Sequence, residues 1–155
     1  MDIRSIPRSR RNPQYEQVAL REAIESAGLS YKHLPALGGH RRANKDSTNT
    51  GWLNPAFRGY ADYMQTDAFG QGLCELLDLE EEAGPLAIMC SEAVPWRCHR
   101  SMVADALVAR GTPVAHILGP APARPHRLNP MARIKGASLS YPAESMPRDH
   151  ASPKK

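Results

Sequence analysis

The chain has no long hydrophobic run. None of its apolar stretches approaches the ~20 residues that a membrane-spanning helix needs. Its opening residues, Met-Asp-Ile-Arg-Ser-Ile-Pro, also lack the apolar segment of a secretory signal peptide. We therefore expect a soluble, cytoplasmic protein that has no membrane partner.

Cysteine is scarce, with three residues in all: Cys74, Cys90 and Cys98. An odd number cannot all pair within one chain, and 155 residues are enough to build a hydrophobic core without disulfide support. We therefore expect free thiols in a reducing compartment. Cys74 lies near leucines on a predicted helix, which favours a place in the core.

Basic residues are absent from residues 61–95, which carry 8 acidic side chains. Residues 1–60 carry 10 basic and 5 acidic side chains, and residues 96–155 carry 10 and 3. Clustered Lys and Arg attract phosphates and carboxylates, which predicts a small anionic ligand. The alternative is a nucleic-acid-associated module that uses the basic segments 8–11, 41–45 and 124–133. Binding that falls steeply with salt would distinguish this alternative from a single anion pocket.

The hydrophobic pattern predicts alternating strands and helices. Strands are expected at residues 1–6, 30–34, 86–89 and 114–118, and helices at 12–28, 55–64, 67–83 and 100–110. This order favours an α/β fold, in which a three-layer, Rossmann-like or flavodoxin-like parallel sheet is flanked by helices.

The rest of the chain organisation follows from this pattern. The first helix should bury one apolar stripe, made of Leu20, Ala23, Ile24 and Ala27. We expect a single domain over residues 1–140, with a small hairpin at 131–140. The proline-rich end, residues 141–155, predicts a disordered basic tail.

Chemically reactive side chains are concentrated between residues 90 and 100. Residues 86–89 form a continuous apolar run typical of a buried strand, and Pro95 precedes a helix that starts near Cys98. Ligands of parallel α/β sheets bind beyond the carboxyl ends of the strands, where helix N-termini offer N–H groups to anions. His116 lies in the last expected strand, where a hydrogen-bonded core histidine is the commoner outcome. The predicted anion-binding residues are Arg4, Arg8, Arg97, His99 and Arg100.

Cys90, Glu92 and Cys98 are the candidate catalytic residues. A thiol near a helix N-terminus and arginines has a lowered pKa, so Cys90 or Cys98 is a candidate nucleophile. The alternative is that each thiol is a small buried apolar group. Arg97 misses the Cys-x5-Arg spacing of a phosphatase loop by one residue, which disfavours a phosphatase. Glu92 is placed either to transfer or position a proton or to pair with a neighbouring arginine.

A metal site is a further alternative. Cys90, Cys98 and His99 are donors that zinc accepts, with His33 or Glu92 as a fourth ligand. Seven residues separate the two cysteines, more than the two to four usual in zinc sites, which disfavours a metal-binding structural domain. The sequence identifies no cofactor.

Four groups of residues stand out together in one order. They are Asp2-Ile-Arg4 with Pro7, Leu34-Pro-Ala-Leu-Gly-Gly39, Gly59-Tyr-Ala-Asp-Tyr-Met64, and Cys90-Ser-Glu92 followed by Cys98-His-Arg100. Over residues 1–141 this pattern resembles the domain of unknown function 488 family. The resemblance implies the α/β fold and a Cys-x-Glu…Cys-His-Arg site. It does not supply a reaction, because the activity of that family is unsettled.

Members of that family usually begin with a further strand and helix, before the strand that holds Asp2 here. The resemblance therefore implies that this chain is N-terminally truncated. A sheet edge or an apolar surface would then be exposed, and self-association is the expected consequence.

Overall fold

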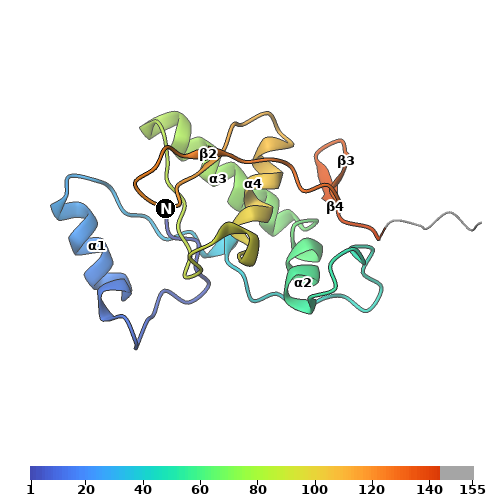
Figure 1. Ribbon diagram of the computed structural model, residues 1–155, viewed down its shortest axis with the longest axis horizontal. Coiled ribbons are helices and arrows are strands. Elements are labelled where there is room, and N and C mark those ends of the chain that lie inside the picture. Colours follow the sequence, from blue (N-terminus) through green and yellow to red (C-terminus); the bar gives the residue numbers. More distant parts are fainter. Residues whose placement is uncertain (144–155) are drawn as a thin grey trace, which may run out of the picture.

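The computed structural model describes residues 1–143, and it is mostly helical (Figure 1). The α-helices are α1 (Gln17–Ser26), α2 (Pro55–Tyr63), α3 (Asp67–Ala83) and α4 (Arg100–Val108). Three short 3-10 helices are η1 (Pro13–Tyr15), η2 (Pro35–Leu37) and η3 (Pro95–Arg97). The strands are β1 (Ala115–His116), β2 (Arg124–Pro125), β3 (Arg133–Lys135) and β4 (Ser138–Ser140).

Local sequence signals set the ends of the helices. At α2, Asn54 Oδ1 accepts a hydrogen bond from the Ala56 N–H (2.9 Å), and Pro55 occupies the first turn. The side chain of Thr66 caps the start of α3, and Gly84, at φ 82°, ends it. The helices predicted at 55–64, 67–83 and 100–110 are confirmed, although α4 ends at Val108.

The predicted Rossmann-like or flavodoxin-like parallel sheet is wrong. The described residues form only two sheets, each with two antiparallel strands: β1 with β2, and β3 with β4. The segment expected as the last parallel strand contributes β1, which instead pairs with β2 in the antiparallel direction. The β3–β4 pair is the hairpin expected at 131–140.

The extended segments meet over too short a length to form a parallel sheet. Asp2 makes isolated parallel bridges with His33 and Met89, and the described residues contain no other parallel pairing. Pro35 begins η2 soon after His33, and proline has no N–H to continue a ladder. In the N-terminal segment that contains Asp2, residues 5–6 form a bend. Each pairing therefore stops after one bridge.

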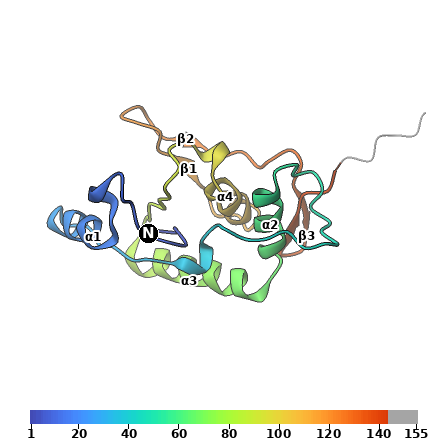
Figure 2. The ribbon, with the colours of Figure 1, turned by 90° about the horizontal axis from the view of Figure 1, so that it is seen from below.

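The hydrophobic core surrounds α4, in which residues 102–107 are all buried. Figure 2 shows α4 nearly end-on, with α2 to one side and the β1–β2 pair close by. The core joins residues from well-separated parts of the sequence. Its fully buried members include Ile3, Leu37, Tyr60, Phe69, Leu73, Met102, Val103 and Tyr141.

Helix α1 lies apart from this core, at one end of the molecule (Figure 1). The predicted burial of its apolar stripe is wrong, because none of its residues is buried. Leu20 and Ile24 are half-buried, whereas Ala23 is exposed and Val18 is 69% exposed. The element that packs most closely against α1 is the short helix η1, which offers too little apolar surface to cover a stripe.

Two further predictions concern membrane-spanning helices and the C-terminal tail. No helix in the described part of the chain is long and apolar enough to cross a membrane. The tail predicted from residue 141 onwards falls mainly on residues 144–155, which lie outside the described residues. Tyr141 itself is fully buried.

Candidate functional site

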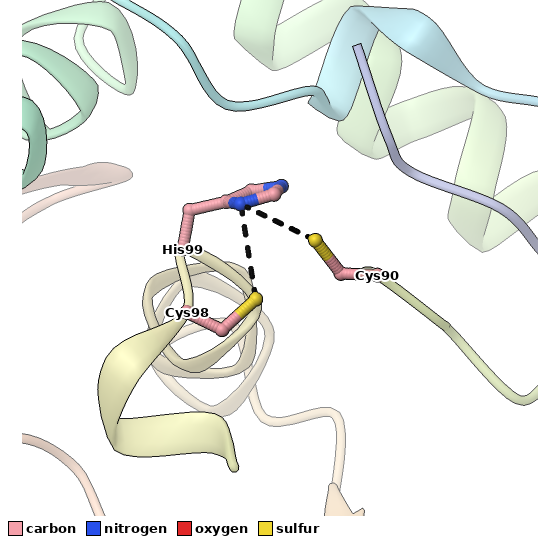
Figure 3. A group of neighbouring side chains, drawn as sticks. All are labelled: Cys90, Cys98 and His99. Carbon is pink, nitrogen blue, oxygen red and sulfur yellow. Dashed lines mark hydrogen bonds between the residues drawn. The ribbon is translucent and has the colours of Figure 1, made fainter. Parts of the chain in front are cut away.

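Two thiols and one imidazole converge at the N-terminus of α4 (Figure 3). The Sγ atoms of Cys90 and Cys98 each lie 3.8 Å from Nδ1 of His99. The three side-chain donor atoms all lie within 4.8 Å of one another. The structure thus brings together three of the residues that the sequence predicts for the site.

The backbone explains why these side chains meet. Cys90 follows Met89, whose carbonyl accepts a hydrogen bond from the Ile3 N–H (3.1 Å) and so holds the segment against the N-terminal residues. Pro95 opens η3, which turns the chain, and the Cys98 N–H closes this turn on the Pro95 carbonyl (2.9 Å). A proline-fixed turn therefore brings Cys98 back towards Cys90.

The thiol of Cys98 also takes the place of a helix cap. His99, the N-cap residue of α4, makes no capping hydrogen bond with its side chain. The Arg100 N–H instead donates to Sγ of Cys98 (3.4 Å). Cys98 is only 2% exposed, so this sulfur is held inside the protein at the positive end of the helix.

Two neighbours fix the ring of His99. The ring centroid of Tyr60, in α2, lies 4.9 Å from that of His99. Gly39 faces the same ring, and a Cβ atom at this position would stand 3.0 Å from Nδ1 of His99. Nε2 of His99 is buried and has no hydrogen-bond partner in the described part of the chain. Gly39 and Tyr60 both belong to the groups of residues that carry the family resemblance, and the structure places both beside His99.

The two thiols differ in their preferred protonation states. The hydrogen bond from the Cys98 thiol is the main cause that lowers the pKa of Cys90, to about 3, and His99 and the Glu92 N–H act in the same direction. The same hydrogen bond to Cys90, together with burial, raises the pKa of Cys98. The pair therefore holds one thiolate, on Cys90, and one thiol, on Cys98.

Two cavities meet at Cys90. The smaller, of about 350 Å³, is lined by Arg97 together with Cys98 and His99. The larger, of about 730 Å³, is lined by Arg8 and Arg100 among others. Cys90, Ser91 and Glu92 line both cavities, and so does Arg4. A half-buried sulfur thus borders two spaces in which a ligand could sit.

The predicted anion-binding arginines occupy different surroundings. Arg4 is 5% exposed and its guanidinium is bound to Asp2, with Nη2 2.6 Å from Oδ2. Arg100 donates from Nη1 to the Glu92 carbonyl (3.1 Å) and from Nη2 to the Ala93 carbonyl (3.4 Å). Arg8 and Arg97 are exposed, each at the wall of one cavity.

The side chains of the remaining candidates do not join Cys90, Cys98 and His99 in the compact group of donor atoms. Nε2 of His33 donates to the Arg4 carbonyl (2.7 Å), and His33 does not belong to the group of donor atoms around Cys90. Glu92 is exposed. Cys74, expected in the core, is exposed on the surface of α3. Within residues 1–143, a metal ion would therefore have Cys90, Cys98 and His99 as its protein ligands.

These features define a paired-thiol site with an adjacent imidazole, built where an extended segment meets a helix N-terminus. The chain belongs to the family described as Domain of unknown function DUF488, which matches residues 1–107. This match confirms the family resemblance, and it includes the whole cysteine cluster. No curated protein and no solved structure is found to match the chain.

Proposed function

We propose that this protein is an enzyme in which the Cys90 thiolate acts as a nucleophile towards a small phosphorylated or nucleotide-like anion. The observation that carries the proposal is the convergence of hydrogen-bonding groups on one sulfur. The Cys98 thiol, the His99 imidazole and the Glu92 N–H all stabilise negative charge on Sγ of Cys90. The Ser91 hydroxyl lies 3.8 Å from the same atom. A thiolate is far more nucleophilic than a thiol.

The surroundings of Cys90 fit an anionic substrate. Arg97 lines the smaller cavity and Arg8 the larger, and guanidinium groups bind phosphates and carboxylates in a bidentate manner. Glu92 lines both cavities, within reach of a leaving group or of water. Cys98 remains protonated, so only one of the two sulfurs acts as the nucleophile.

Alkylation with iodoacetamide tests the proposal without a known substrate. The labelling rate of each cysteine is measured by peptide mass spectrometry at pH 7 and pH 5. An unperturbed thiol loses about 100-fold in thiolate fraction over this range. Cys90, with a pKa of about 3, should label at nearly the same rate at both pH values. Cys74 is exposed on α3 and serves as the internal reference.

Two variants at position 98 sharpen this test. Cys98→Ala removes the hydrogen bond that lowers the Cys90 pKa most, so labelling of Cys90 at pH 5 should fall steeply. Cys98→Ser keeps a donor at the same place and should retain most of the rate. If labelling of wild-type Cys90 falls about 100-fold between pH 7 and pH 5, as expected for an unperturbed thiol, the thiolate proposal is wrong.

A metal function is the second candidate, and the compact donor set of Cys90, Cys98 and His99 favours it. Two thiolates and one imidazole with an open fourth position are a ligand set that catalytic zinc sites use. Such a metal would hold both sulfurs deprotonated and would polarise a bound water or substrate oxygen.

Zinc analysis of the purified protein separates the two candidates. A metal site predicts close to one zinc per chain after dialysis, lost in Cys98→Ala, with Cys90 protected from iodoacetamide until a chelator is added. The thiolate proposal predicts substoichiometric zinc, and Cys90 labelling that a chelator does not change. Stoichiometric zinc together with a protected Cys90 would show that Cys90 is a metal ligand and not a nucleophile, and the metal proposal would then stand in place of the thiolate proposal.

A further inference from the structure

A series of hydrogen bonds runs from α4 to the wall of the larger cavity. Asp105, in α4, is 1% exposed. Its Oδ1 lies 2.8 Å from Nε2 of His126 and accepts the Asn129 N–H (2.9 Å), while Oδ2 accepts the Tyr141 hydroxyl (2.8 Å). Nδ1 of His126 in turn lies 2.8 Å from Nε2 of His116. Asp105, His126 and His116 are therefore linked in series.

The carboxylate decides which ring nitrogens carry protons. Because a carboxylate accepts hydrogen bonds, Nε2 of His126 must be the donor to Asp105, and when this is the only proton on the ring, Nδ1 of His126 is an acceptor. Nε2 of His116 must donate to that acceptor. The lone pair of neutral His116 is thereby placed on Nδ1, which has no hydrogen-bond partner among residues 1–143.

His116 belongs to the wall of the larger cavity, as Arg100 does. Burial is the main cause that lowers the pKa of His116. The charge of Arg100 lowers this pKa further, as would a positive charge on His126 whenever that ring is protonated, and Asp105 opposes them. His116 is therefore neutral near pH 7, and the lone pair on its Nδ1 can accept a hydrogen bond.

We infer that His116 is a ligand-binding residue of the larger cavity, which accepts a hydrogen bond at Nδ1 from a hydroxyl group of the ligand. His126 and Asp105 are the residues that position it. A hydroxyl is the donor class that fits, because the neighbouring Arg100 guanidinium repels cationic donors such as ammonium groups. This role does not depend on whether Cys90 is a nucleophile.

The orientation of His116 can be read directly by nuclear magnetic resonance of protein labelled with nitrogen-15 in histidine. We expect Nε2 of His116 to be protonated and Nδ1 unprotonated at pH 7. A scalar coupling between His116 Nε2 and His126 Nδ1 should report the hydrogen bond between them. The titration midpoint of His116 should lie below the ordinary value of 6.5.

Two variants distinguish a positioned histidine from a merely buried one. His126→Phe removes the acceptor, so the coupling should be lost and both tautomers of His116 should become populated. Asp105→Asn removes the charge that raises the His116 pKa, so the midpoint should shift further down. If Asp105→Asn does not fold, His126→Phe carries the test alone. An unchanged tautomer in every folded variant would overturn the positioning role.

Diethyl pyrocarbonate, which modifies unprotonated imidazole nitrogens, tests whether Nδ1 is open to the cavity. Modification is read by peptide mass spectrometry at pH 7, with the exposed His40 as internal reference. We expect His116 to be modified in the folded wild-type protein. If His116 reacts only after unfolding, or if Nδ1 proves to be protonated at pH 7, the inference is wrong.

Discussion

Helices α1 and α4 have nearly the same length, 10 and 9 residues, and opposite relations to the core. None of the residues of α1 is buried, whereas residues 102–107 of α4 are all buried. The difference does not come from the apolar stripe, which is well formed in α1. The difference comes from the elements that pack against each helix. Helix α4 has neighbours around most of its surface, whereas α1 packs mainly against η1. An apolar stripe leads to burial only where another element supplies a matching surface.

The same comparison applies to function. The N-terminus of α4 carries the paired thiols, and its Asp105 anchors the two linked histidines. The described residues of α1 take part in neither group. We therefore expect substitutions in α4 to affect both stability and chemistry, and equivalent substitutions in α1 to affect neither strongly.

The largest expected effect is the loss of packing at Met102, which is fully buried in α4. Met102→Ala should lower the free energy of unfolding by about 2–5 kcal/mol, because it leaves a cavity in the core. Val18→Ala in α1, where the side chain is 69% exposed, should stay within about 0.5 kcal/mol. Urea denaturation of both variants measures this difference. Equal losses would mean that α1 is packed as tightly as α4.

A smaller effect is expected from the hydroxyl of Tyr141. Burial, followed by the charge of Asp105, raises the pKa of Tyr141, so its hydroxyl stays protonated and donates to that carboxylate. Tyr141→Phe should cost about 1.5–3 kcal/mol, the usual range for a hydrogen bond to a charged group. Tyr15→Phe is the matched control, since Tyr15 is 47% exposed in η1. Its unfolding midpoint in urea should match that of the wild type.

The smallest effect concerns the backbone of α1. Ala23→Gly should weaken the isolated helix by about 1 kcal/mol, because glycine is a poor helix former. Amide hydrogen exchange in α1 should become faster, while the global unfolding free energy remains almost unchanged. A matching loss of global stability would show that α1 unfolds together with the core, and the contrast with α4 would fail.

Elements whose ends carry local signals were predictable from the sequence. Pro55 opens α2 and Gly84 ends α3, and the Cys90 to Arg100 stretch marks the paired-thiol site. The parallel sheet was not predictable in the same way, because an apolar run does not reveal how far two segments pair. Asp2 makes single bridges where continuous ladders were expected.

The linked histidines show a second limit of sequence reasoning. His116 could be recognised as a histidine in an apolar segment, with a hydrogen-bonded core histidine as the favoured interpretation. Its partner His126 lies in a proline-rich stretch without periodicity, and Asp105 lies inside a helix. No local pattern connects the three residues, because their hydrogen bonds depend on how the chain beyond α4 returns to that helix.

The contacts that the chain beyond α4 makes with that helix have a consequence for how the protein folds during synthesis. All three donors to the Asp105 carboxylate come from residues made later: His126, Asn129 and Tyr141. The Tyr141 N–H also closes a contact with Asn49, far back in the chain (2.8 Å). Contacts of such long sequence separation form late, because the entropy of closing the loop must first be overcome. On the ribosome, the Asp105 carboxylate should therefore lack its full set of hydrogen-bond donors until Tyr141 has left the exit tunnel, and folding should be completed only then.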